Sequence, residues 1–164
     1  MTDPSIDAER LLGRLRDLGE VGRDDRGRLA RLALSDADKA GRDTVVGWMR
    51  AAGLEVAIDR IGNVFGIRHG EIDAAPIMVG SHIDTVVDAG LYDGNYGVLA
   101  GLEVIETLRD AGVTPRRPIV VAAFTDEEGA RYAPDMLGSL VYIGGLDLDT
   151  ALATIGVDGT VLGE

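Results

Sequence analysis

The sequence predicts an α/β fold, with a mixed sheet and helices on both of its faces. Two short apolar runs, 75–80 and 118–124, have the length and composition of buried strands. Between them, residues 98–108 place apolar side chains at helical spacing, and Gly112 follows as a stop signal. Because a strand–helix–strand crossover makes its two strands parallel, we expect the carboxyl ends of both strands to meet at one edge of the sheet.

Two helices are expected before this unit. The first covers residues 6–18, where apolar residues that include Ile6 recur roughly on one helical face, and it ends near Gly19. A charged loop punctuated by glycines follows. Ser35 and Asp38 resemble the start of a capped helix, so a second helix is expected to begin there and to end at Gly53.

A hairpin and two less regular segments complete the predicted elements. Residues 54–58 and 63–67 are typical of two strands joined through the turn at 60–62. Beyond the crossover, residues 136–143 fit either a short helix or a strand, and residues 149–155 are interpreted as helical. We find no internal repeat and no linker-like segment, so the sequence indicates no internal domain boundary.

The composition is that of a globular protein. The chain has 46% hydrophobic residues and no cysteine, which excludes both a disulfide framework and a thiolate metal site. Its net charge of -12 argues against a nucleic-acid partner or an anionic membrane surface. No apolar run reaches transmembrane length, and residues 1–4 do not resemble a secretory signal. We therefore expect a cytoplasmic protein without a nucleic-acid or membrane partner.

Residues suited to metal binding follow the predicted strands. His82 follows the first crossover strand, Asp93 lies in the loop before the helix, and Glu127 and Glu128 follow the second strand. Imidazole and carboxylate groups bind divalent metal ions, and one carboxylate can bridge two ions. Since ligands of open α/β sheets gather at the carboxyl ends of the strands, these residues are expected to form one site. The sequence thus predicts a metal-dependent hydrolase.

Each of these residues also has a structural interpretation. A single histidine near a strand end is more often structural than a ligand. Asp84 favours the ligand role for His82, because a metal-bound imidazole usually donates its other N–H to a carboxylate and residues two apart in a strand share a side. Taken alone, Asp93 would be a turn residue, and Glu127 and Glu128 would be solvated charges. His69 is interpreted as a surface residue. For Arg131 and Ser139 contact with the substrate stays open as an alternative, although a surface or structural role is favoured.

Longer motifs surround the candidate residues. They cover 80–86, 90–101, 124–132 and 136–139, with upstream extensions at 31–35 and 61–66. Together these motifs resemble the family of N-carbamoyl-L-amino acid hydrolases, β-ureidopropionases and allantoate amidohydrolases. This family is related to dinuclear zinc aminopeptidases and deacylases, whose peptidase members have a longer insertion between the metal histidine and the bridging aspartate. The short separation of His82 from Asp93 favours the amidohydrolase branch.

The resemblance implies a zinc-exopeptidase-like fold and two divalent metal ions, either zinc or manganese, cobalt or nickel. It implies that His82 binds one ion, that Asp93 bridges both and that Glu128 binds the second. Glu127 would be the general base, and Asp84 would orient His82. The implied substrate is a small molecule, an N-carbamoyl amino acid or a ureido acid, hydrolysed at a linear amide or ureido C–N bond. Full-length members of the family are expected to be homodimers.

The chain departs from the family in its length. Family members are much longer, and residues 1–164 resemble only the N-terminal part of their metal-binding catalytic domain. Two further metal histidines and a lid or dimerisation domain have no counterpart here. We therefore expect a fold that is incomplete at its C-terminal side and a chain that is inactive alone. Two alternatives remain open: a truncated, non-catalytic fragment or partner-dependent piece, and a dinuclear zinc peptidase or deacylase.

Overall fold

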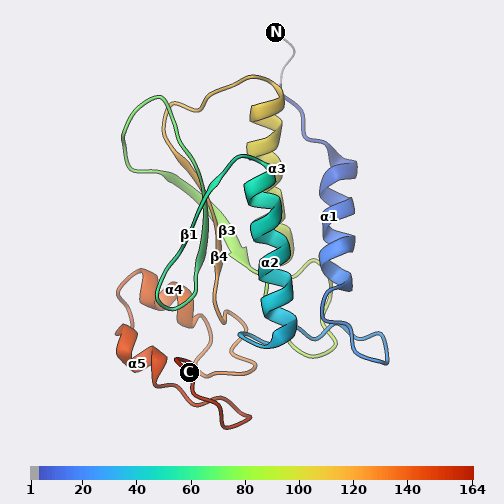
Figure 1. The fold of residues 1–164 in the computed structure, drawn as a ribbon, viewed down its shortest axis with the longest axis vertical. Helices are drawn as coiled ribbons and strands as arrows, with labels where there is room; N and C mark the ends of the chain where they lie inside the picture. Colours follow the sequence, from blue (N-terminus) through green and yellow to red (C-terminus); the bar gives the residue numbers. More distant parts are fainter. Residues whose placement is uncertain (1–3) are drawn as a thin grey trace.

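A computed structural model describes residues 4–164, so most of the N-terminal segment assessed above for a secretory signal lies outside the described residues. Figure 1 shows the order of the elements along the chain. They are α1 (Ala8–Glu20), α2 (Asp36–Ala51), β1 (Glu55–Ile58), β2 (Val64–Arg68), β3 (Ile77–His82), α3 (Asn95–Asp110), β4 (Ile119–Phe124), α4 (Leu137–Tyr142) and α5 (Leu148–Leu152).

The sheet is mixed, with the strand order β1-β2-β4-β3. β1 pairs with β2 and β2 pairs with β4 in antiparallel fashion, whereas β3 runs parallel to β4. The predicted hairpin and the predicted crossover are both confirmed. His82 pairs in register with Phe124 at the carboxyl ends of β3 and β4. The loops that follow these two strands therefore leave the sheet at the same edge.

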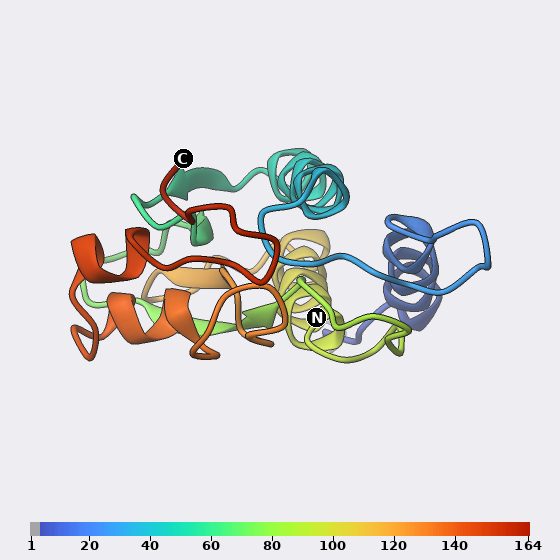
Figure 2. The same ribbon diagram turned by 90° about the horizontal axis from the view of Figure 1, so that it is seen from below.

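Three helices lie on one side of the sheet, as Figures 1 and 2 show. α2 packs on the hairpin, α3 packs on β3 and β4, and α1 packs against α3. The close approach of α3 requires glycine on its inner face. A Cβ atom on Gly97 would lie 2.7 Å from the Cβ of Ser81, and one on Gly101 would lie 2.9 Å from a methyl group of Val79. The main hydrophobic core fills this layer; it includes Leu15, Leu18, Val45, Met49, Leu99, Leu102, Ile105 and Val121.

The opposite side of the sheet carries α4 and α5 (Figure 2). The ring of Tyr142 in α4 lies 5.4 Å from the ring of Phe65 and 5.7 Å from that of Phe124, measured between centroids. A smaller core gathers beneath the two helices. It consists of Ala33, Ile61, Tyr132, Leu137, Ala151 and Leu162. Helices on both faces, as the sequence predicted, are confirmed.

The strand β3 differs from its prediction as a buried strand. Within residues 4–164 it is an edge strand, and Ile77 and Val79 are 50% and 39% exposed, whereas Val121 in β4 is fully buried. The prediction was wrong because an apolar run has the same composition at the edge of a sheet and at its centre. Only the pairing of strands distinguishes the two positions.

Capping determines where the helices begin. The side chain of Ser35 accepts a hydrogen bond from the backbone N–H of Asp38, as predicted. Asp7 caps α1 in the same way, so the helix begins at the next residue, Ala8. Ile6 consequently lies before the helix and is 58% exposed, although it was expected inside the helix, on one face with the other apolar residues. None of the helices within residues 4–164 combines the length and the apolar character needed to cross a membrane.

Candidate metal centre

His82 is the last residue of β3, and its side chain is buried. The imidazole Nδ1 lies 2.9 Å from the main-chain carbonyl oxygen of Asp84. Because a carbonyl can only accept a hydrogen bond, this contact favours the tautomer in which Nδ1 donates and Nε2 carries a free lone pair. Nε2 is therefore the nitrogen available to bind a cation.

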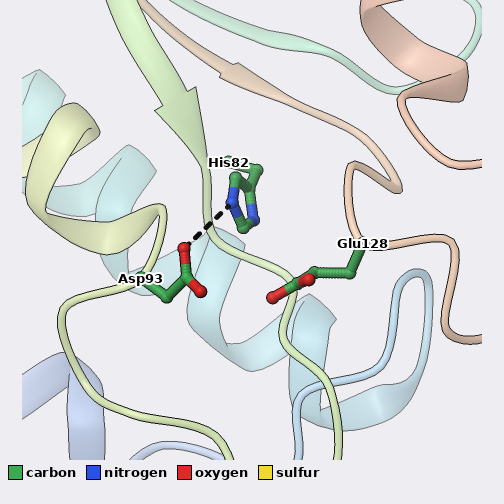
Figure 3. A group of neighbouring side chains, drawn as sticks. All are labelled: His82, Asp93 and Glu128. Carbon is green, nitrogen blue, oxygen red and sulfur yellow. Dashed lines mark ion pairs between the residues drawn. The ribbon is translucent and has the colours of Figure 1, made fainter.

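Carboxylates approach Nε2 from two other segments of the chain. Asp93 Oδ1 lies 3.9 Å from Nε2, and Glu127 Oε2 lies 3.2 Å from it. His82, Asp93 and Glu128 each offer one ligand atom, and these three atoms lie within 4.8 Å of one another. Figure 3 shows the three side chains converging from the end of β3, the turn before α3 and the loop after β4. The predicted site residues are thus brought to one edge of the sheet.

The electrostatics of this cluster fit a cation. Burial raises the pKa of the Glu128 carboxyl, and the negative charges of Asp93 and Glu127 raise it further, while His82 acts in the opposite direction. A divalent cation would offset this repulsion between carboxylates. One imidazole nitrogen with carboxylate oxygens is also a donor set that zinc and related ions bind. The residues present therefore fit a divalent metal ion.

Gly94 makes room for the imidazole of His82. A Cβ atom at this position would lie 2.5 Å from both Nε2 and Cε1 of the ring, closer than any real contact. The backbone φ of Gly94 is also positive, at 62°, a conformation that residues with a side chain rarely adopt. The glycine lets the ring approach the turn that carries Asp93. In the sequence, the signal for this position was only the glycine that follows Asp93.

Asp84 joins the two strand ends. Its buried carboxylate accepts hydrogen bonds from the backbone N–H groups of Glu127 and Glu128, at 3.3 and 3.2 Å. Its Oδ1 atom lies 3.6 Å from Nδ1 of His82. The contact differs from the one expected from the sequence, because the main-chain carbonyl of Asp84 takes the short contact with His82. The carboxylate instead holds the backbone of the loop that follows β4.

Asp126 lies beside the candidate ligands but is not among the site residues that the sequence predicts. It is buried, has a positive φ of 53°, and neither carboxylate oxygen has a hydrogen-bond partner within residues 4–164. Burial, assisted by the charge of Asp84, raises the pKa of Asp126 to about 7. Its positive φ shows that the backbone changes direction just before the candidate residues Glu127 and Glu128.

His69, Arg131 and Ser139 lie at exposed positions or make hydrogen bonds within the fold. His69 is exposed and lies 2.9 Å from the carboxylate of Glu55. Arg131 donates hydrogen bonds to Asp158 and to the carbonyl oxygen of Ala33. The hydroxyl of Ser139 donates to the carbonyl oxygen of Met136. The candidate metal group contains none of these three polar residues.

Several known proteins are similar to this chain in sequence and in fold. Residues 63–163 match Peptidase family M28. The chain is 44% identical over 160 residues to an N-carbamoyl-L-amino acid amidohydrolase of Geobacillus stearothermophilus, covering 97% of this chain and 39% of that protein. It is 38% identical over 143 residues to allantoate deiminase 1 of Glycine max, covering 83% of this chain and 29% of that protein.

A solved structure is also similar to the chain. A hydantoinase/carbamoylase family amidase from Burkholderia ambifaria matches with a TM-score of 0.95 and 48% identity, covering 98% of this chain and 40% of that one. The resemblance stated from the motifs and the predicted fold class are both confirmed. The chain spans less than half the length of each of these relatives.

Proposed function

The chain belongs to Peptidase family M28, and on that premise we propose that it forms part of the metal centre of an amidohydrolase acting on N-carbamoyl amino acids or related ureido acids. The observation that carries the proposal is the convergence of His82, Asp93 and Glu128 within 4.8 Å. The names of the amidohydrolase and the deiminase that are 44% and 38% identical to the chain support this substrate class over a peptide.

His82, Asp93 and Glu128 would be the ligands that this chain supplies to two divalent ions, and Asp93 would serve both, because a carboxylate offers two oxygen atoms. Zinc suits this donor set, and so do manganese, cobalt and nickel. When bound, the ions polarise the carbonyl of the substrate and lower the pKa of water. Asp84 keeps Glu127 and Glu128 in place through their backbone N–H groups.

Glu127 is the proposed general base. Its carboxylate lies beside Nε2 of His82, and its side chain is 39% exposed, so that water and substrate can reach it. As the oxygen of water attacks the carbonyl carbon, Glu127 takes the proton. It returns this proton to the nitrogen that leaves when the C–N bond breaks. The neighbouring carboxylate of Glu128 would hold metal and would take no part in this proton transfer.

Three ligands are too few for two catalytic ions. A catalytic zinc usually has three protein ligands and an open position, whereas the candidate group found within residues 4–164 has three ligands in all. We propose that ligands outside these residues complete the centre in the whole protein. The chain alone should bind metal weakly and should not turn over substrate. Its cytoplasmic location and a homodimeric whole protein remain predictions.

Two measurements test the proposal. Calorimetric titration of the chain with Zn²⁺ should detect binding that His82→Ala abolishes and that His69→Ala, at the exposed histidine, leaves unchanged. The whole protein should hydrolyse N-carbamoyl-L-amino acids or allantoate when metal is supplied, and dipeptides poorly. Equal Zn²⁺ binding by His82→Ala and wild type would overturn the site. A preference for dipeptides would overturn the substrate class and favour a peptidase.

A further inference from the structure

Arg31 is fully buried, and it lies in the segment between α1 and α2, outside every helix and strand. A guanidinium keeps its charge at any ordinary pH. Burying such a charge is costly unless its donors are satisfied. The acceptors that surround it therefore indicate what the residue does in the fold.

The guanidinium donates hydrogen bonds to four groups from three segments. Nε donates to the carbonyl oxygen of Ile83 at 2.7 Å, and Nη1 donates to those of Leu18 and Val21 at 2.9 and 2.7 Å. Nη2 donates to Oδ1 of Asn95 at 2.8 Å. The acceptors come from the end of α1, from the residue after β3 and from the first residue of α3.

Two of these acceptors adjoin candidate metal ligands. Ile83 directly follows His82, and Asn95 lies two residues after Asp93, whose carbonyl oxygen is 2.6 Å from the backbone nitrogen of Asn95. One planar group thus connects the main chain beside the imidazole with the turn that carries the carboxylate. The ligands themselves are left free to face one another.

The surroundings are shaped for a guanidinium. Gly41 in α2 faces its stem, and a Cβ atom there would lie 2.6 Å from Cδ of Arg31. The backbone N–H of Arg31 donates to Oγ1 of Thr85, and its carbonyl oxygen accepts from the N–H of Thr85, both at 2.8 Å. The rigid fork can reach several acceptors in one plane, whereas the single ammonium of a lysine cannot span them.

We propose that Arg31 is a positioning residue for the candidate metal centre, because its guanidinium sets the distance between the strand end that carries His82 and the turn that carries Asp93. The inference rests on the proposed function. An arginine that only attached α1 to the rest of the fold would affect stability alone. A positioning residue would also affect the affinity for metal.

The test compares Arg31→Lys with Arg10→Lys in the chain, using calorimetric titration with Zn²⁺ and urea denaturation. Arg10 also joins α1 to α3, but through Glu103 and Asp110, further along the helix from Asn95. Both variants should lose stability. Arg31→Lys should also bind Zn²⁺ about 10- to 100-fold more weakly, the usual effect of removing a partner beyond the ligands, whereas Arg10→Lys should bind it as wild type does.

Asn95→Ala is the second variant, and it covers the case in which Arg31→Lys does not fold. It keeps the three carbonyl contacts of Arg31 and removes the connection to α3, together with the hydrogen bond that Asn95 Nδ2 donates to the carbonyl oxygen of Leu91. It should weaken Zn²⁺ binding in the same direction. Wild-type affinity in folded Asn95→Ala would overturn the positioning role and leave the proposed function intact. Absence of Zn²⁺ binding by the wild-type chain would overturn both.

Discussion

The imidazole of His82 occupies the space that a side chain at Gly94 would fill, with Nε2 and Cε1 both 2.5 Å from the position of a Cβ atom. Gly94→Ala should therefore push the ring away from Asp93 and weaken Zn²⁺ binding by at least about 10-fold, as other disruptions of ligand orientation do. Calorimetric titration measures the affinity. Gly90→Ala is the control, since a Cβ atom at Gly90 would meet no atom of residues 4–164 within 4 Å. Equal affinities for the two variants would contradict the prediction.

Substitutions of Glu127 and Glu128 should have different effects in the whole protein, because Glu127 is the proposed general base and Glu128 is a proposed metal ligand. Glu127→Gln should keep its metal and lose turnover by about 10²- to 10⁴-fold, the usual contribution of a general base. Glu128→Gln should lose metal. Metal content by mass spectrometry, measured beside turnover, separates the two. Near wild-type turnover in fully loaded Glu127→Gln would exclude that residue as the base.

Asp84→Asn should weaken metal binding although Asp84 is not a proposed ligand. The carboxylate accepts from the N–H groups of both Glu127 and Glu128, and an amide has only one acceptor oxygen. The loop after β4 should loosen, and Zn²⁺ affinity should fall by about 10- to 100-fold. Asp88→Asn removes the same charge from an exposed position in the segment between β3 and α3, which also carries Asp84, and should have little effect. A similar loss in both variants would point to charge rather than position.

The stability of the chain should depend on pH through Asp38. Burial raises the pKa of its carboxyl from 3.8 to about 6, against the opposing effect of Arg42. The folded state then holds this proton more tightly than the unfolded state, so the carboxyl stabilises the fold below about pH 4, and this contribution disappears as the pH rises through 6. At pH 8 the free energy of unfolding of Asp38→Asn should be about 1–3 kcal/mol higher than that of the wild type, and this difference should disappear near pH 4. Urea denaturation at both pH values tests this, and a constant difference would contradict it.

Within residues 4–164, β3 has no strand partner on its outer edge, and this edge should make the chain self-associate. Ile77 is 50% exposed there, and it borders a groove of about 580 Å³ between β3 and α3 that Val79 and Val104 also line. Ile77→Lys should reduce association, because a charged side chain at a strand edge hinders pairing with another strand. Size-exclusion chromatography with light scattering measures the mass. Val157→Lys adds the same charge at an exposed position outside the sheet and should not change association. A monomeric wild-type chain would contradict the prediction.

The sequence by itself determined the fold class and the edge of the sheet where the candidate site lies. The apolar runs before His82 and Asp126 and the helical spacing between them indicate a crossover, and a crossover makes its strands parallel. Residues that follow two neighbouring parallel strands must share an edge. The convergence of His82, Asp93 and Glu128 could therefore be predicted from local patterns and connectivity alone.

Only the tertiary structure decided the contacts that shape the site. The spacing of Asp84 from His82 shows that the two residues are neighbours, but the partners of its carboxylate lie more than 40 residues away in the sequence. Arg31 likewise lies in an irregular segment, and its acceptors come from segments that meet only when the helices pack. The exposure of Ile77 could not be predicted either, because it depends on how the strands pair. Local sequence encodes propensity and hydrophobicity, whereas hydrogen-bond partners and edge positions depend on which distant segments pack together.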